Sequence, residues 1–522
     1  MIATREHERL TIQKALDAGK TPLERNKLGQ FATPSALAGQ VLDAARELLP
    51  SHTPIRFLDP AFGTGAFYSA LLATFPEENI SRAVGYEIDP YYGESARSLW
   101  QDSPLELNLR DFTKAPFPAD EADRANLIVC NPPYVRHHHL DGADKLRLAQ
   151  RALSAAGVRL SGLAGLYCHF LCISHAWLAA NGIGVWLIPS EFMDVNYGQQ
   201  VKDYLLSKVT LLRIHRFDPE TTQFDDALVS SAVVFFRNAT PPPNHSATFT
   251  FGESLLDPAV TREVSADEMR QANKWTGLVF ADETDVDESA AATMKLSDLF
   301  TITRGIATGS NGFFVLPRLK AQELNLPEQF LRPILPSPRY LKDCKIEAAR
   351  DGYPILPEPL CLLDCPLPQD QVQSQYPALW QYLEQGMNAD VDKGYICAHR
   401  TPWYSQEQRP AASLLCTYMG RKGKTTDAFR FILNKSKATA ANVYLLLYPK
   451  PHVAAALRQR PELLEAVWHA LNQIPPDSLK HVGRVYGGGL HKLEPRELAN
   501  APADEIGQLL NISTQHRQAM LF

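Results

Sequence analysis

A strand, a glycine turn and the start of a helix follow one another in Phe57-Leu58-Asp59-Pro60-Ala61-Phe62-Gly63-Thr64-Gly65-Ala66-Phe67. Glycines at such a turn let a ligand approach the backbone, and they leave the first N–H groups of the following helix free to bind it. Several nucleotide-binding folds share a Gly-x-Gly pair, so the surrounding pattern has to distinguish between them.

Strand-like and helix-like segments alternate around this turn, from Ile55 to about Asn238. The candidate strands are 55–61, 83–88, 105–111, 126–130, 183–189, 211–217 and 228–236, and the helical patterns are 66–75, 91–100, 143–155, 166–180 and 197–207. Apolar strands separated by helices predict a parallel sheet covered on both faces. The last two strands have no evident helix between them, which predicts an antiparallel pair at one edge. We therefore predict the α/β class with a doubly wound seven-stranded sheet, whose ligand site lies at the carboxyl ends of the strands.

The length of 522 residues is too great for one hydrophobic core, so more than one domain is expected. We predict an α/β domain over 1–245, a connecting segment over 246–290 and a mixed α+β domain over 291–522. No run of about 18 uninterrupted apolar residues occurs, and the charged N-terminus lacks the apolar core of a signal peptide, so no membrane association is expected. Eight scattered cysteines indicate reduced thiols, as in a cytosol.

The net charge of −6 is unevenly distributed. Residues 291–522 hold 26 Lys and Arg against 21 Asp and Glu, and the totals of 52 and 58 leave 26 against 37 for residues 1–290. Within 400–437 eight residues are basic and two are acidic. This distribution favours the C-terminal half as the part that meets a polyanion. A merely solvated basic stretch is the alternative.

Acidic residues follow or precede the ends of the first three strands. Asp59 precedes the glycine turn, where an acid disfavours phosphate and suits the cationic end of S-adenosylmethionine. Glu87 ends the next strand at a spacing that suits a carboxylate holding two ribose hydroxyls, whereas Asp89 suits the cap of the following helix. Asp111 closes the third strand, where it can accept from an adenine amino group while Phe112 packs on the ring.

The tetrapeptide Asn131-Pro132-Pro133-Tyr134 follows the strand at 126–130. The Asn131 side chain and the Pro132 backbone each provide a carbonyl oxygen, and the two prolines fix the turn. Accepting both hydrogens of an exocyclic amino group pushes its nitrogen towards a nucleophilic, pyramidal shape. Tyr134 offers a flat face on which a displaced base can stack. A proline-rich turn without a catalytic role is the alternative.

Together these segments resemble the N6-adenine DNA methyltransferases of the gamma arrangement, the family of the TaqI methyltransferase and related type II modification enzymes. The resemblance covers about residues 25–240, and it includes Gly29-Gln30-Phe31-Ala32-Thr33-Pro34, which matches the Gly-x-x-x-Thr-Pro segment of that family. It implies that Thr33 holds the carboxylate of the cofactor S-adenosylmethionine. It further implies a cofactor site of Asp59, Ala61, Gly63, Glu87, Ile88, Asp111, Phe112 and Asn131, and a catalytic motif of Asn131, Pro132 and Tyr134.

The family also has an aromatic residue that precedes a Ser-Ala-Val-Val strand and packs on the target base. Phe224 precedes Ser231-Ala232-Val233-Val234 here, and Phe217 is the alternative. In the C-terminal half, Thr303-Arg304-Gly305-Ile306-Ala307-Thr308-Gly309-Ser310-Asn311-Gly312-Phe313-Phe314 and Gly487-Gly488-Gly489-Leu490-His491-Lys492-Leu493-Glu494-Pro495 resemble segments of target-recognition domains. Turn-forming residues between strands are the alternative. Arg421-Lys422-Gly423-Lys424 is expected to contact phosphates.

The resemblance implies a site-specific DNA methyltransferase that methylates N6 of an adenine flipped out of double-stranded DNA. Residues 1–245 are then the catalytic domain and residues 291–522 the target-recognition domain. We expect a monomer in the bacterial cytoplasm, associated with the nucleoid, and a cognate restriction endonuclease as a functional counterpart that it need not contact.

Three other functions stay open. The same tetrapeptide serves methylation of an RNA adenine or of a glutamine amide in a protein. A fused restriction-modification enzyme is disfavoured, because about 28 residues precede the cofactor segment and no nuclease motif is evident later. An inactive module that only binds DNA is disfavoured by the intact tetrapeptide.

Two patterns bear on metal binding. His137-His138-His139 are adjacent, so their side chains point in different directions, and we expect them in a loop near the DNA. Cys361, Cys365, Cys397 and His399 are poorly spaced for a zinc ribbon. No metal site is predicted.

Overall fold

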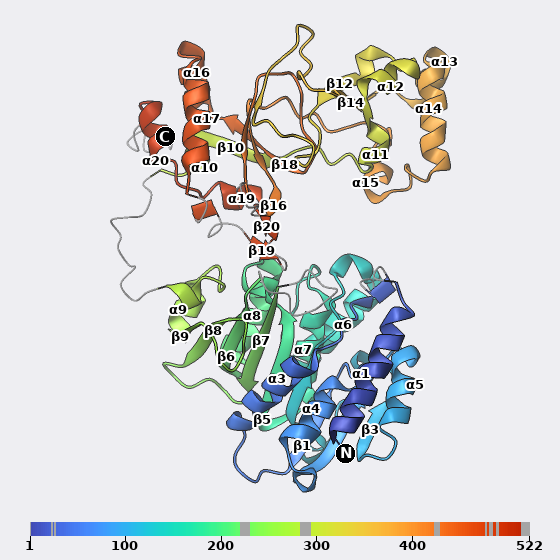
Figure 1. Cartoon of the computed structure of the whole chain (residues 1–522), viewed down its shortest axis with the longest axis vertical. Coiled ribbons are helices and arrows are strands. Elements are labelled where there is room, and N and C mark those ends of the chain that lie inside the picture. The colour runs from blue at the N-terminus through green and yellow to red at the C-terminus, as the bar shows by residue number, and fades with distance from the viewer. Residues whose placement is uncertain are drawn as a thin grey trace. The chain divides into compact units, whose positions relative to one another are not determined.

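The computed structural model describes residues 2–21, 24–25, 28–219, 230–281, 294–421, 428–475, 478–479, 484–486 and 490–512. Two compact units divide near residue 285 (Figure 1). Within these described ranges, no helix combines the length and the apolar character that crossing a membrane requires.

A nine-stranded sheet with the order β3-β2-β1-β4-β5-β7-β6-β8-β9 forms the centre of the first unit. Its strands are β1 (Ile55–Asp59), β2 (Ile80–Tyr86), β3 (Leu105–Asn108), β4 (Ala125–Cys130), β5 (Leu178–Pro189), β6 (Thr210–Phe217), β7 (Ser231–Arg237), β8 (Ser246–Gly252) and β9 (Val260–Ser265). The first five strands are parallel neighbours, whereas β7 runs antiparallel between β5 and β6. The predicted α/β class and the antiparallel pairing of the sixth and seventh strands are confirmed.

The sheet is wider than the seven strands predicted, because β8 and β9 extend it beyond β6. β8 pairs parallel with β6, and β9 pairs antiparallel with β8, so the β6–β7 pair does not form the edge. The expectation of a connecting segment over 246–290 is therefore wrong for 246–265. β8 reads Ser-Ala-Thr-Phe-Thr-Phe-Gly, in which apolar and polar residues alternate as in a half-buried strand.

The helices of the first unit cover both faces of the sheet. They are α1 (Ile2–Ala18), α3 (Ser35–Leu48), α4 (Ala66–Thr74), α5 (Pro90–Leu99), α6 (Gly142–Ala156), α7 (Leu166–Ser174), α8 (Gln199–Ser207) and α9 (Ala266–Gln271). The sequence patterns predict neither α1 nor α3. The helix expected at 166–180 ends at Ser174, because Leu178 already pairs with Ala125 at the start of β4.

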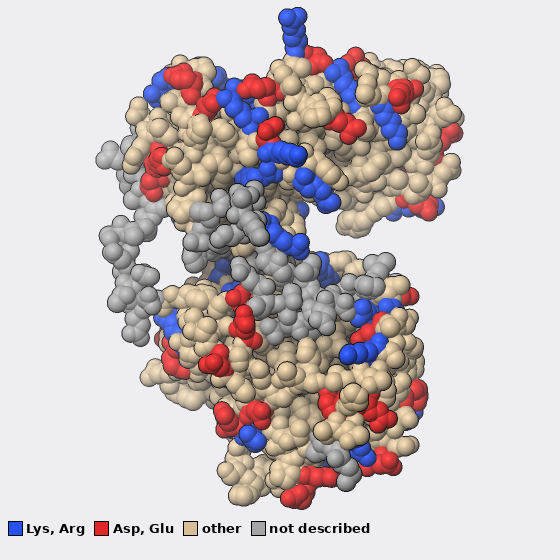
Figure 2. Space-filling model, viewed as in Figure 1, with Lys and Arg blue, Asp and Glu red and all other residues tan. Residues whose placement is uncertain are grey.

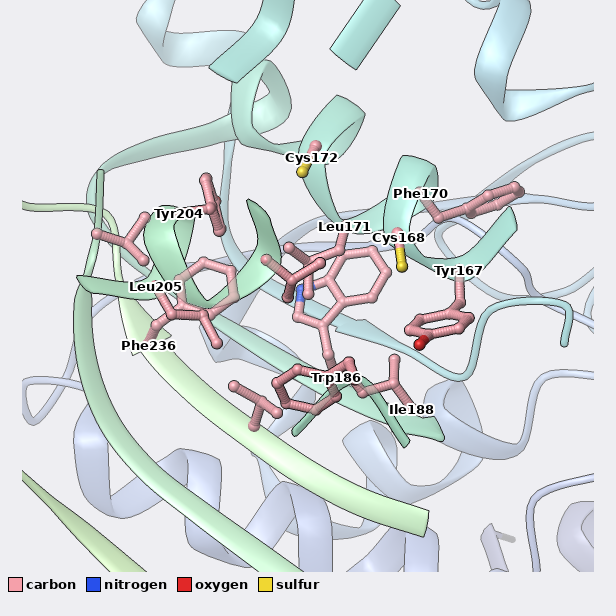
Figure 3. Packing of buried hydrophobic residues seen from close by; sticks show 14 of the residues in the cluster. Tyr167, Cys168, Phe170, Leu171, Cys172, Trp186, Ile188, Tyr204, Leu205 and Phe236 are labelled. Carbon is pink, nitrogen blue, oxygen red and sulfur yellow. The ribbon is translucent and has the colours of Figure 1, made fainter. Parts of the chain in front are cut away.

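Neighbouring residues of a strand enter different core clusters. Phe57 packs in the cluster of α3 and α4, whereas Leu58 packs in the cluster of α6, α7 and α8. In Figure 3, Trp186 of β5 directs its indole ring at α7 near Leu171, and this side chain is fully buried. Strands buried on both faces must be almost continuously apolar, which explains their composition.

The described residues after 285 form three smaller sheets. The first has the order β10 (Phe300–Arg304), β18 (Tyr444–Pro449), β15 (Leu414–Thr417), β17 (Phe431–Asn434) and β13 (Lys345–Ile346). The second consists of β11 (Val315–Pro317), β14 (Leu360–Leu363) and β12 (Leu331–Ile334), and the third of β16 (Met419–Arg421), β20 (Leu490–Lys492) and β19 (Arg484–Tyr486).

Helices accompany these sheets throughout the second unit. They are α10 (Leu296–Leu299), α11 (Asn311–Phe314), α12 (Arg318–Glu323), α13 (Gln369–Gln375), α14 (Pro377–Asn388), α15 (Tyr395–Ala398), α16 (Pro451–Gln459), α17 (Leu463–Gln473), α19 (Pro495–Leu498) and α20 (Asp504–Leu509). The mixed α+β character predicted for the C-terminal half is confirmed.

Candidate active site

Two adjoining cavities lie at the carboxyl ends of β1, β2 and β4. The larger has a volume of about 630 Å³ and the smaller one of about 50 Å³. Both are lined by Ala61 and Gly63 of the turn after β1 and by Asn131 after β4. Ligands of open parallel sheets bind at this edge.

The residues predicted to bind the cofactor converge on these cavities from separate elements. The larger cavity is lined by Ala61, Gly63, Glu87, Ile88, Asp111, Phe112 and Asn131, and the smaller one by Thr33, Asp59, Ala61, Gly63 and Asn131. The fold therefore brings together every residue that the sequence patterns assigned to this site.

Glu87 holds the glycine turn in place. Its carboxylate accepts the N–H of Gly63 and the N–H of Asp89, each at 2.8 Å. Burial raises the pKa of Glu87. Asp89 caps α5, as predicted, by accepting the N–H of Tyr91 at 3.0 Å. Gly65 has φ of +90°, and a Cβ there would lie 2.7 Å from the rings of Phe62 and Trp100, so only glycine fits.

Asp59 is a buried carboxylate with one hydrogen bond from the turn. Its Oδ1 accepts the N–H of Ala61 at 3.1 Å, and the side chain is 1% exposed. Burial raises the pKa of Asp59 to about 8, and the negative charge of Glu87 adds to the effect. A cation bound beside this carboxylate would stabilise its ionised form, so the smaller cavity is suited to an ammonium group.

An apolar wall with a carboxylate at its edge lines the far part of the larger cavity. Phe112 is buried and packs at 5.4 Å, centroid to centroid, from both Tyr86 and Trp177, whereas Ile88 is 66% exposed. Oδ1 of Asp111 accepts hydrogen bonds from the N–H and the hydroxyl of Thr113, at 2.9 and 2.7 Å. This arrangement suits a purine ring with an exocyclic amino group.

Asn131 is held in one orientation by the segment before α3. Its Nδ2 donates to the Phe31 carbonyl at 3.0 Å and to the Thr33 hydroxyl at 3.1 Å. Its Oδ1 is buried and has no hydrogen-bond partner among the described residues. Leaving such an oxygen unpaired costs about 1–3 kcal/mol, which a donor on a ligand would remove. The site therefore presents a fixed acceptor to whatever enters it.

Tyr134 is fixed at both ends. Its N–H donates to the Gly29 carbonyl at 3.1 Å, and its hydroxyl donates to the Leu187 carbonyl at 3.1 Å. Its ring lies 5.7 Å from that of Phe31, and burial raises the pKa of the hydroxyl far above its usual range. Gly29 has φ of +65°, and a Cβ there would lie 2.4 Å from the Tyr134 nitrogen. The close approach of these two backbones therefore requires glycine.

The two aromatic residues predicted to pack on the target base have different outcomes. Phe224 lies outside the described residues. Phe217 is buried in the core and packs edge-on against His215, with a centroid distance of 4.6 Å. A ring buried in this way offers no face to a base, so Phe217 is not the aromatic residue that packs on the target base.

Known proteins match the whole length of this architecture. Residues 272–519 match the C-terminal domain of the type II methyltransferase M.Eco57I, and residues 78–224 match the Eco57I restriction-modification methylase. Over 550 residues the chain is 27% identical to the type II methyltransferase M.AccI of Acinetobacter calcoaceticus, covering 100% of this chain and 95% of that protein. The chain is therefore similar over its whole length to the type II restriction-modification methyltransferases.

Further relatives agree with this family. The type II methyltransferase M.XamI of Xanthomonas campestris pv. amaranthicola is 26% identical over 507 residues, which cover 94% of this chain and 89% of that protein. Among solved structures, the type IIL restriction-modification enzyme MmeI in complex with DNA superposes with a TM-score of 0.50 at 14% identity, covering 87% of this chain and 63% of MmeI. The last likeness concerns the fold alone.

The sequence patterns do not reveal the contribution of α1 to the site. Gln13 and Asp17 line the larger cavity, as does Lys20 just after the helix, and Arg9 and Gln13 line the smaller one. α1 reads IATREHERLTIQKALDA, in which apolar residues are few and scattered, so no helical periodicity marks it. Its packing against α4 and α5 is visible only in the folded structure (Figure 1).

The metal-like patterns of this methyltransferase have other surroundings. His137–His139 form a short 3-10 turn. The thiols of Cys361 and Cys397 are buried and directed at the carbonyls of Leu316 and Thr308. Across the described ranges, no three His, Cys, Asp or Glu side chains are grouped so that they could hold a metal ion.

Part of the basic stretch at 400–437 is engaged within the second unit. Arg400 donates to the carbonyls of Ala307 and Thr308, at 2.6 and 3.0 Å, and Arg430 donates to the Pro338 carbonyl at 2.8 Å. Arg421 ends β16 and is exposed, whereas residues 422–424 lie outside the described ranges. Figure 2 shows further Lys and Arg side chains near the middle of the visible face of this unit.

The first of the two segments that resemble target-recognition domains includes a glycine with a structural role. A Cβ at Gly305 would lie 2.2 Å from the Ala441 carbonyl oxygen, so backbone packing explains this residue. Residues 487–489 lie outside the described ranges, and Leu490–Lys492 form β20.

Proposed function

We propose that this type II methyltransferase transfers a methyl group from S-adenosylmethionine to N6 of an adenine in double-stranded DNA. It would be the protective half of a restriction-modification system. The observation that carries the proposal is the buried, unpartnered Oδ1 of Asn131 at a cavity suited to this cofactor.

The side chains around the cavities complement S-adenosylmethionine along its length. Asp59 would face the ammonium end, Glu87 would accept from ribose hydroxyls, and Phe112 with Asp111 would face the adenine. A volume of about 630 Å³ is within the usual range for a ligand of this size. When bound, S-adenosylmethionine supplies an electrophilic methyl group on a sulfonium.

Asn131 and Pro132 would activate the amino group that attacks. Among the described residues, no hydrogen bond ends on the Pro132 carbonyl oxygen, and the Asn131 Oδ1 is equally free of a partner. Two acceptors fixed on one rigid turn can bond both hydrogens of the amino group and direct its lone pair out of conjugation. Their dipoles also stabilise positive charge that develops on the nitrogen. Rate acceleration then comes mainly from alignment.

The target base would leave the duplex to reach Asn131, because its amino group is otherwise paired within the helix. Unstacking costs a few kcal/mol, which stacking on an aromatic ring can offset. We assign this role to Tyr134, whose bonds to Gly29 and Leu187 hold its ring in one position. Phe224 is proposed as the second aromatic contact, and residues 291–522 as the part that recognises the DNA sequence.

The test compares Asn131→Ala with the control Asn79→Ala. Asn79 lies directly before β2, at the amino ends of the parallel strands and opposite the carboxyl ends at which the cavities lie. Plasmid DNA is incubated with methyl-labelled cofactor, digested to nucleosides and analysed by mass spectrometry. We expect N6-methyladenine with the wild type and with Asn79→Ala. Asn131→Ala should lose about 100-fold or more in rate, the scale for removing one preorganised hydrogen-bonding group, and should still bind S-adenosylhomocysteine.

Parallel reactions separate the alternatives. RNA and a glutamine-containing peptide replace the plasmid under the same conditions. Methylated RNA adenine or glutamine, with no modified plasmid, would overturn the proposed substrate. A normal rate for Asn131→Ala on plasmid DNA would remove Asn131 from the catalytic step.

A further inference from the structure

Arg9 lies in the wall of the smaller cavity, although its helix carries none of the recognised motifs. It belongs to α1, it is 1% exposed, and it lines the same cavity as Asp59. Of the described residues that line this cavity, it is the one with a cationic side chain. A buried cation beside a small polar cavity is suited to an anionic group.

The guanidinium is fixed by four hydrogen bonds. Nε and Nη2 donate to the two Glu6 carboxylate oxygens at 2.7 and 2.6 Å, and Nη2 also donates to the Ser35 hydroxyl at 3.1 Å. Nη1 donates to the Thr64 hydroxyl of the glycine turn at 3.1 Å. A guanidinium has five N–H donors, so one N–H of Nη1 has no partner within the described part of the chain.

Thr64 ties this arrangement to the turn that holds the cofactor. Its hydroxyl accepts a hydrogen bond from Arg9 and donates one to the Gln13 side-chain oxygen at 2.6 Å. Two residues of α1 are therefore hydrogen-bonded to one residue of the turn. The guanidinium therefore cannot rotate away from the cavity without breaking these bonds. A donor fixed in this way loses little side-chain entropy when it binds an anion.

We propose that Arg9 binds the α-carboxylate of the methionine part of S-adenosylmethionine, which makes α1 part of the cofactor site. Arg9 presents a cation to the cavity, and Asp59 presents a carboxyl group that a bound ammonium would hold in its ionised form, so the cavity can take both charged groups of an α-amino acid. Thr33, which the family resemblance assigns to the carboxylate, already accepts from Asn131 and carries no charge. This inference rests on the proposed cofactor, but it does not depend on adenine as the target.

A purely structural role for Arg9 would act equally on every ligand of the site. The discriminating ligand is decarboxylated S-adenosylmethionine, which keeps the adenosine, the sulfonium and the amine but lacks the carboxylate. The full-length protein is titrated calorimetrically with both ligands as wild type, Arg9→Gln and Arg9→Lys. Lys14→Gln, an exposed cation on the same helix, is the matched control.

We expect the wild type to bind S-adenosylmethionine about 10- to 100-fold more tightly than the decarboxylated ligand, the range for a buried charge-assisted hydrogen bond. Arg9→Gln should weaken S-adenosylmethionine by the same factor and leave the decarboxylated ligand within about twofold. Arg9→Lys should keep part of the preference for S-adenosylmethionine over the decarboxylated ligand. Lysine retains the positive charge but lacks the paired N–H groups of the guanidinium. Lys14→Gln should match the wild type.

Equal weakening of both ligands by Arg9→Gln would show that Arg9 only supports the fold, and would overturn the proposal. Equal affinity of the wild type for the two ligands would overturn it as well. If circular dichroism shows that Arg9→Gln is unfolded, the preference measured with Arg9→Lys decides in its place. A wild type that binds neither ligand would refute the proposed cofactor itself, a result distinct from these.

Discussion

Replacing Gly29 with alanine should disable methyl transfer while leaving most of the fold intact. The added Cβ would lie 2.4 Å from the Tyr134 nitrogen, and ordinary contacts begin at 3.4 Å, so the two backbones must separate by about 1 Å. The left-handed φ of +65° adds about 1–2 kcal/mol of strain for a residue with a Cβ. A displacement of about 1 Å at reacting groups costs on the order of 100-fold in rate.

The assay measures the initial rate of methyl transfer to plasmid DNA together with the thermal midpoint of unfolding. Gly39→Ala is the matched control, because Gly39 lies within α3 and a Cβ there meets nothing within 4 Å. This control should keep the wild-type rate and gain about 0.5–1 kcal/mol of stability, since alanine is the better helix former. Gly29→Ala should lose about 100-fold in rate.

A Gly29→Ala protein with the wild-type rate would refute the reasoning. It would mean that the segment 29–33 can move away from Tyr134 without disturbing Asn131, although Phe31 and Thr33 hold the Asn131 amide. Loss of rate in both alanine variants would point to a general effect of substitution rather than to the contact at Tyr134.

Two other changes probe the cofactor end and the base end of the site. Burial raises the pKa of Asp59 to about 8, so at pH 7 this carboxyl group is mostly protonated in the free protein, and binding an ammonium beside it should release about one proton. Calorimetry in buffers of different ionisation enthalpy measures this release, which Asp59→Asn should abolish. A wild type that releases no proton would contradict the assignment. Tyr134→Phe removes the hydrogen bond to the Leu187 carbonyl but keeps the ring, so we expect about 1 kcal/mol less stability and near-normal methyl transfer. Tyr134→Ala should weaken binding of an unstacked base by about 1–3 kcal/mol. Urea unfolding and methyl-transfer rates of the two variants test this, and equal rates for both would show that the ring does not stack on the base.

The composition of the first unit predicts its sheet well, because the strands are buried on both faces. β1, β4 and β5 are apolar runs bounded by turns, and their parallel arrangement follows from the helices between them. β8 and β9 are half-buried strands with polar residues on one side, so their membership of the sheet was set by pairing with β6 rather than by composition. The sequence does not predict α1 either, because its few apolar residues show no helical periodicity.

The order of residues along the chain was sufficient to predict which groups of the strand ends line the two cavities. A parallel sheet places the ends of β1, β2 and β4 at one edge, so Asp59, Glu87 and Asn131 had to meet there. Tertiary structure alone decided which way the Asn131 amide faces and that Arg9 closes the smaller cavity. Both depend on hydrogen bonds between segments distant in sequence, and local patterns carry no information about such bonds.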